Sequence, residues 1–199
     1  MQKHIYTTAL ILAMAIFPAM SAQAQGMDGG SSIHPYAGMG LGAFGLEYND
    51  TSTSVKKTAF GGYGKLGADI GDYFGAEVRI GATGSVSQTL PATTITLQAP
   101  TFFSYFGKLQ FPVTSDFKVY ALAGATTAQF KGTNTAGFNR TETKTGFSYG
   151  AGVDYSLQDT ISASVEWVQY WNDVDIPSTW GTNAKAKIWG IVLTGEYHF

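Results

Sequence analysis

Five charged residues lie where the sequence alternates between polar and apolar side chains, and they are its best candidates for chemistry: Glu77, Arg79, Lys108, Asp154 and Glu166. In a β-strand, residues two positions apart point to the same side, so Glu77 and Arg79 share a face. Carboxylates and cations that face one enclosed space form a proton or ion pathway, a general-acid pair, or a structural network of ion pairs. The size of that space, which the surrounding elements set, decides among the three.

The rest of the chain predicts those elements. Stretches of about ten residues with period-two alternation are separated in turn by short turns and by longer polar loops, as transmembrane barrels require. We predict an all-β, eight-stranded, antiparallel up-and-down transmembrane β-barrel with strands at Pro35 to Tyr48, Ala59 to Ile70, Tyr73 to Val86, Ile95 to Phe111, Phe117 to Lys131, Gly146 to Leu157, Thr160 to Trp171 and Lys185 to Phe199. The long loops lie together at one end: Asn49 to Thr58, Ser87 to Thr94, Gly132 to Thr145 and Asn172 to Ala184. Both termini of the barrel are expected at the short-turn end.

Alternation assigns the two faces of the strands. Apolar residues are expected to face outward at Val78, Ile80, Ala151, Val153, Ile191 and Leu193, and charged residues inward at Glu77, Arg79, Asp154 and Glu166. An eight-stranded lumen is just wide enough for side chains to fill, and buried charges are costly unless they are paired. If Glu77 pairs with Lys108 or Arg79, and Asp154 and Glu166 share the remaining cation, side chains close the lumen. We therefore interpret the charges as a structural network, with an ion conduit as the alternative.

The first segment predicts export. Lys3 precedes an apolar run from Ile5 to Met20, and Ala22-Gln23-Ala24 follows as a signal peptidase site. This pattern predicts a signal peptide over residues 1–24 and a barrel domain over residues 25–199. The alternative is a retained anchor helix, for which the run is too short.

Aromatic residues gather near both ends of the predicted strands. One group lies near the short turns: Tyr73, Phe74, Phe111, Phe117, Tyr155, Tyr197 and Phe199. The other lies near the long loops: Tyr48, Phe60, Phe130, Phe147, Trp171 and Trp189. Two such groups are typical of the interfacial girdles of a membrane barrel.

Several other chemistries are excluded or disfavoured. The chain has no cysteine, and only His34 and His198 follow the predicted leader, both at the short-turn rim. It has no glycine-rich phosphate loop before a helix and no His/Asp cluster at metal-ligand spacing. A net charge of −2 offers no broad basic surface for nucleic acid. We therefore expect no enzyme activity, cofactor, metal or nucleic-acid partner.

Several motifs, in this order and spacing, resemble the OmpA-like and opacity-type eight-stranded outer-membrane barrels. The resemblance covers nearly all of the chain after the leader and rests on Pro35 to Gly38, Phe60 to Tyr63, Asp72 to Glu77, Lys108 to Thr114, Tyr149 to Tyr155 and Glu166. It implies that Glu77, Lys108, Asp154 and Glu166 face the lumen.

The resemblance also implies departures and partners. Gly40, Leu122 and Ser164 stand where OmpA carries inward basic residues, and Arg79 and Lys65 are expected to compensate. Tyr197 and Phe199 resemble the C-terminal signature that the family presents to the barrel-assembly machinery.

These observations lead to one expected function and two alternatives. We expect a non-enzymatic protein of the bacterial outer membrane, exported by its signal peptide, that supports envelope integrity and displays four surface loops. It would contact outer-membrane lipid and lipopolysaccharide. The first alternative is an adhesion or surface-recognition protein that binds host or environmental ligands through its loops, and the second is a narrow, low-conductance pore.

Overall fold

The computed structural model describes residues 32–51, 54–91, 93–177 and 183–199. The leader predicted over residues 1–24 lies outside the described residues. In the described part of the chain, no helix has the length and apolar character needed to cross a membrane.

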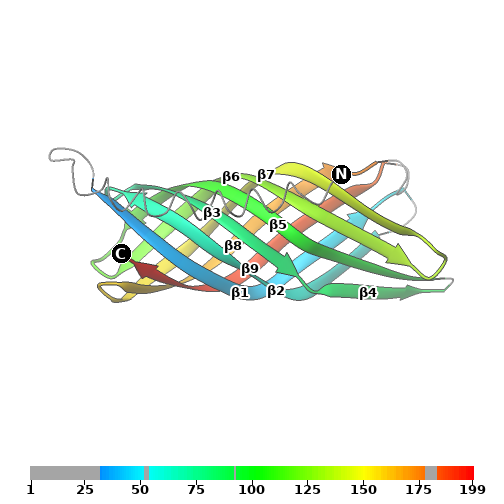
Figure 1. The fold of residues 1–199 in the computed structure, drawn as a ribbon, viewed down its shortest axis with the longest axis horizontal. Coiled ribbons are helices and arrows are strands. Elements are labelled where there is room, and N and C mark those ends of the chain that lie inside the picture. The colour runs from blue at the N-terminus through cyan, green and yellow to red at the C-terminus, as the bar shows by residue number, and fades with distance from the viewer. Residues whose placement is uncertain (1–31, 52–53, 92, 178–182) are drawn as a thin grey trace, which may run out of the picture.

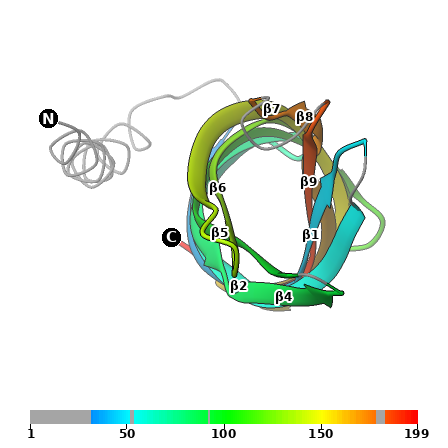
Figure 2. The ribbon, with the colours of Figure 1, turned by 90° about the vertical axis from the view of Figure 1, so that its right-hand side faces the viewer.

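The described residues form nine antiparallel strands that belong to one sheet (Figure 1). They are β1 Ile33–Asn49, β2 Ser54–Ile70, β3 Phe74–Thr83, β4 Ser85–Leu90, β5 Thr93–Pro112, β6 Phe117–Asn134, β7 Asn139–Gln158, β8 Ile161–Asp175 and β9 Lys185–His198. β3 pairs with β5 as well as with β2, and β1 pairs with β9, so eight strands close into a ring (Figure 2). The predicted eight-stranded up-and-down barrel is confirmed, and β4 is an additional strand beyond the ring.

The predicted third strand, Tyr73 to Val86, is not continuous. It ends at Thr83 and resumes at Ser85 as β4, and the amide of Gly84 between them donates to the carbonyl of Phe60 at 2.8 Å. β3 pairs with both neighbours in the ring, whereas β4 pairs with β5 among the described residues. The break at Gly84 is therefore the point at which the wall loses its connection to β2.

The strands run further than predicted at the end with the long hairpins. Residues 54–58 and most of 132–145, which the sequence predicts as loops, are strand residues. Residues 132–145 are rich in threonine and residues 54–58 contain Val55 and Thr58, and such β-branched side chains favour extended backbone even where the surface is polar.

At the end with the long hairpins, which we describe as above the ring, the wall divides into two four-stranded sheets. Pairing between β2 and β3 stops at Gly61 and Thr83, and pairing between β7 and β8 stops at Tyr149 and Gln169. Beyond these points the ends of β8, β9, β1 and β2 form one sheet, here the β1 sheet. β4 and the ends of β5, β6 and β7 form the other, here the β5 sheet.

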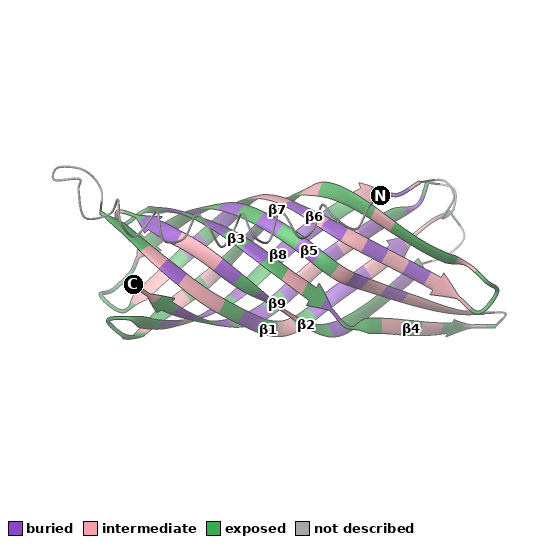
Figure 3. Cartoon of the chain, viewed as in Figure 1, coloured by how far each residue is buried: buried purple, intermediate pink, exposed green. Residues whose placement is uncertain are grey.

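The predicted faces of the ring strands are confirmed, and Figure 3 shows the alternation of buried and exposed positions along them. The apolar residues named above are exposed on the outside: Val78, Ile80, Ala151, Val153, Ile191 and Leu193. Glu77, Arg79 and Glu166 are buried, and Asp154 is half-buried.

The prediction of an interfacial aromatic group near the long loops is wrong for three of its members. Phe60 and Phe147 are exposed, but Tyr48, Phe130 and Trp171 are buried inside. Here the two sheets enclose an apolar core, which includes Leu46, Val55, Leu97, Phe130, Trp171 and Ile188. Tyr48 and Phe130 follow the inward parity of their strands. Trp171 turns inward because the register of β8 shifts between Gln169 and Trp171.

Candidate functional site

The guanidinium of Arg79 lies at the centre of the charged interior. Its Nε donates to Glu77 Oε1 at 2.6 Å, its Nη2 donates to Glu166 Oε2 at 2.8 Å, and it forms an ion pair with each carboxylate. Its Cζ also lies 4.7 Å from the ring centroid of Tyr63 and 4.9 Å from that of Phe106. The Arg79 side chain is fully buried. Two carboxylates accept hydrogen bonds from the edge of its guanidinium, and aromatic rings lie over the guanidinium face.

Tyrosine hydroxyls satisfy the remaining acceptor positions of the two carboxylates. Tyr36 donates to Glu77 Oε2 at 2.8 Å, Tyr120 donates to Glu166 Oε2 at 3.0 Å, and Tyr63 donates to Glu166 Oε1. These tyrosines come from β1, β6 and β2, so one network joins several strands across the lumen. We call Glu77, Arg79, Glu166 and these three tyrosines the Arg79 cluster.

A second set of ion pairs lies nearer the short-turn end. Lys65 Nζ is 2.7 Å from Glu196 Oε1 and 3.9 Å from Glu77 Oε2. Lys108 Nζ is 2.6 Å from Asp69 Oδ1. Lys65 thus connects this set to the Arg79 cluster.

The structure brings together some of the five predicted residues and separates others. Glu77 and Glu166 share Arg79, whereas Lys108 pairs with Asp69, a residue that the sequence analysis did not single out. Asp154 lies apart from the cluster and accepts a hydrogen bond from Ser162 at 3.0 Å. The condition that Glu77 pairs with Arg79 is met, whereas Asp154 and Glu166 share no cation, because Glu166 pairs with Arg79 together with Glu77.

Sequence reasoning missed Asp69, Glu196 and the tyrosines, although strand parity marks them. Asp69 lies four residues after Lys65 on β2, and Glu196 has the opposite parity to the exposed Tyr197 on β9. Tyr36 and Tyr63 likewise share the inward parity of their strands.

The interior positions that lack the family's basic residues are filled in other ways. Leu122 and Ser164 are buried in the lumen. A Cβ at Gly40 would lie 2.8 Å from the ring of Tyr63 and 2.7 Å from the side chain of Val192, so these two side chains occupy that space. The cations of the lumen come instead from Lys65, Arg79 and Lys108.

A small polar cavity lies below the Arg79 cluster. Its volume is about 10 Å³, room for about one water molecule, and its lining includes Lys65, Asp69, Lys108, Gln110 and Asp154. Gln110 Nε2 is buried there and has no hydrogen-bond partner among the described residues. This end of the lumen is therefore polar but nearly filled.

A layer of aromatic rings closes the lumen on the other side of Arg79. The ring centroids of Phe102 and Tyr170 are 5.1 Å apart, those of Phe44 and Phe102 5.8 Å, and those of Phe106 and Tyr170 6.4 Å. All four rings are buried, and the apolar core of the two sheets follows above them. The charged half of the lumen thus ends at an apolar barrier. The described residues contain no group of three or more histidine, cysteine or carboxylate side chains placed to hold a metal ion.

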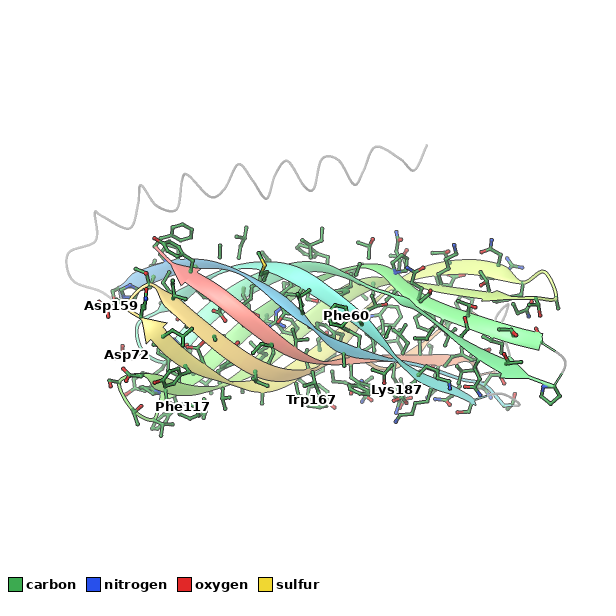
Figure 4. All side chains as sticks on the ribbon, turned by 90° about the horizontal axis from the view of Figure 1, so that it is seen from below. Phe60, Asp72, Phe117, Asp159, Trp167 and Lys187 are labelled. Atoms are coloured by element: carbon green, nitrogen blue, oxygen red, sulfur yellow. The ribbon has the colours of Figure 1, made fainter. Side chains whose placement is uncertain are left out.

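The outside of the ring is mainly apolar, whereas its inside carries the charged residues. Figure 4 shows Phe60 and Trp167 on the outer surface, with Asp72 and Asp159 at the short-turn end and Lys187 toward the long hairpins. The exposed residues between these charged positions are mainly apolar, as a lipid-facing band requires.

The sequence profile of the outer membrane protein beta-barrel domain matches residues 9–199. The chain belongs to this family. Among curated protein sequences, none gives a significant match.

Solved structures share the fold at low sequence identity. Neisserial surface protein A has a TM-score of 0.57 and 16% identity, over 83% of this chain and 97% of that one. Ail, the attachment invasion locus protein of Yersinia pestis, has a TM-score of 0.54 and 15% identity, over 82% and 98%. OprG from Pseudomonas aeruginosa has a TM-score of 0.51 and 13% identity, over 85% and 98%. The family indicates the bacterial outer membrane as the location.

Proposed function

We propose that this chain is a non-enzymatic outer-membrane protein whose closed barrel supports the envelope and carries a two-sheet extension above the outer surface. The observation that carries the proposal is the filled lumen, in which the Arg79 cluster is followed directly by the aromatic layer of Phe44, Phe102, Phe106 and Tyr170. A passing ion would have to separate buried ion pairs and then lose its hydration among aromatic rings. Both steps are costly, so a closed barrel is favoured over a pore.

The direction of the chain in the membrane is part of the proposal. Transmembrane barrels of this type place short turns in the periplasm and longer connections outside the cell. The turns that contain Asp72 and Asp159 would then lie in the periplasm, and the two sheets outside. Export by a signal peptide over residues 1–24 remains part of the same proposal.

The C-terminus provides the proposed contact with the barrel-assembly machinery. Tyr197 and Phe199 are both exposed on the outer face, with ring centroids 5.3 Å apart. Outer-leaflet lipid and lipopolysaccharide would contact the apolar band and the polar residues just above it.

Surface recognition is the second candidate function. One structure of Ail is a complex of that protein with the heparin analogue sucrose octasulfate. In this chain, the two sheets above the ring provide the surface that such a function needs, with exposed polar side chains such as Lys56, Ser87, Thr89 and Lys144.

Planar-bilayer recording tests whether the barrel is closed. The purified wild type should give no steady current, and Glu77→Ala should lose stability because it removes one of the two carboxylates bonded to Arg79. A steady, ion-selective current in the wild type would overturn the proposal in favour of a pore.

Single cysteines test the orientation, because the native chain has none. A membrane-impermeant maleimide should label Thr89→Cys on intact cells, and should label Asp72→Cys only after the outer membrane is permeabilised. The opposite labelling would contradict the proposed orientation.

A further inference from the structure

The division of the wall leaves four strand edges above the ring. The edge strands are β2 and β8 in the β1 sheet and β4 and β7 in the β5 sheet. Above the ring, the outer edge of each of these strands pairs with no other strand among the described residues. Such an edge presents a row of unpaired N–H and C=O groups, which is a template for pairing with another chain. Natural proteins therefore protect exposed edges with charges, bulges or proline.

Three of the four edges have this protection. The end of β2 carries Lys56 and Lys57, and the end of β7 carries Arg140, Glu142 and Lys144. The end of β8 is irregular, because its register shifts between Trp171 and Val174 and Asp173 has a φ of 53°. The side chains of Trp171 and Val174 also lie close to Gly146 of β7, so they cover the gap between β7 and β8.

The edge of β4 has none of these features. Its sequence, Ser85-Val86-Ser87-Gln88-Thr89-Leu90, contains no charged residue and no proline, and its register with β5 is unbroken from Ser85–Gln98 to Leu90–Thr93. Two hydroxyl pairs bind it to β5 on the outer surface, Ser87 with Thr96 at 2.8 Å and Thr89 with Thr94 at 3.3 Å. β4 is thus already held extended, so a partner strand would find its backbone in place.

The opposite side of this gap carries a positive charge. Lys57 lies between Val55 and Ala59 on the inward parity of β2, and both of these neighbours are buried (1% and 6% exposed) while Lys57 is exposed. An inward position that is exposed between two buried ones indicates that the wall is open to solvent here, beside β4.

We propose that the free edge of β4 binds an extended peptide segment of another protein, which adds to the β5 sheet as an antiparallel strand. Backbone hydrogen bonds to β4 supply the affinity, as in other cases of strand addition. The segment has alternating apolar and polar residues, because Val86 is half-buried and Ser87 exposed, and it carries a carboxylate on the side that faces Lys57. This inference rests on the proposed function, since the edge meets such partners only if the two sheets lie outside the cell.

A second copy of the chain is a poorer occupant. Two barrels in one membrane have parallel axes, so their β4 strands run in the same direction and would pair in parallel. Parallel pairing is slightly weaker per residue, whereas a free segment can take the antiparallel direction.

Hydrogen exchange on the full-length protein in lipid nanodiscs tests the proposal. The probe is a ten-residue synthetic peptide of alternating valine and threonine with one central aspartate. It should slow amide exchange in residues 85–90 at least about tenfold while leaving the β7 edge, residues 139–147, unchanged. Lys57→Glu should weaken binding about tenfold, and Lys144→Glu, the same charge reversal on β7, should leave it unchanged.

Three results would overturn the proposal: no binding at millimolar peptide, binding without slower exchange in residues 85–90, or equal protection of the β4 and β7 edges. Concentration-dependent protection of β4 without peptide would instead identify a second copy as the occupant. The bilayer recording and the cysteine labelling are independent of this assay, so failure of the proposed function and failure of this inference are distinguishable.

Discussion

Replacing Arg79 by methionine should destabilise the barrel by about 3–5 kcal/mol. The substitution removes the cation that Glu77 and Glu166 share, so that both carboxylates stay buried and only Glu77 keeps another cation, Lys65 at 3.9 Å. Removing one partner of a buried ion pair costs this amount because the other charge stays desolvated. The tyrosine hydroxyls that still donate to the carboxylates, three in number, limit the loss, since each hydrogen bond to a charged group contributes about 1.5–3 kcal/mol.

Urea unfolding in lipid vesicles, followed by tryptophan fluorescence, measures this loss. Lys56→Met is the matched control, because it removes a cation from the surface pair with Glu47 and should cost at most about 1 kcal/mol. Adding Glu77→Gln and Glu166→Gln to Arg79→Met removes the two negative charges that lose Arg79 and should restore most of the stability, since Lys65 keeps its ion pair with Glu196. The reasoning is refuted if Arg79→Met costs less than about 1 kcal/mol, or if the triple variant is no more stable than the single one.

Two further predictions concern the outer surface. Val153→Arg should lower the free energy of unfolding by roughly 2–4 kcal/mol in a bilayer, because its charge meets hydrocarbon. Thr143→Arg, on the same strand above the apolar band, should cost little. Equal losses of stability when both variants are unfolded in lipid vesicles would contradict a lipid-facing Val153. Burial raises the pKa of Glu47, but hydrogen bonds from Lys56 and Trp189 outweigh it and hold the pKa below its ordinary value of 4.5. The stabilisation from Glu47 is therefore complete above its ordinary pKa of 4.5 and is lost as the pH falls through the lowered pKa, so the stability gap between wild type and Glu47→Gln should stay constant at higher pH and shrink as the pH is lowered below 4.5. A gap that stays constant over this range would show that the pair contributes nothing.

The sequence is sufficient to predict the ring, because period-two alternation directly reports which residues face lipid and which face the lumen. Val78 between Glu77 and Arg79 is the clearest case, and the structure confirms each side. Alternation also assigns the inward face of β2, on which both Lys65 and Asp69 lie. It cannot name their partners, since pairing across a lumen depends on the stagger of strands that are distant in sequence.

The extension above the ring is harder to predict because the inward residues of its strands face an apolar core between two sheets and not a charged lumen. On β5, Phe103 faces outward in the ring, whereas Leu97 faces the apolar core between the sheets. The bulge between Gln98 and Thr101 changes the parity of the strand between these two residues. A polar segment with a hidden parity change has the sequence signature of a loop, and only the hydrogen-bond register distinguishes it from a strand.

The separation of the two sheets would allow the β4–β5 hairpin to change its height above the bilayer in fixed steps. Side-chain direction repeats every two residues, so removing Ser87 and Gln88 together with their partners Ile95 and Thr96 would keep every remaining residue of the hairpin on its face. Each such step shortens the hairpin by about 7 Å along the strands. Because β4 pairs with no strand of the β1 sheet among the described residues, the ring and its charges would be unaffected. The reach of this hairpin from the membrane is therefore separable from the part of the chain that stays in the membrane.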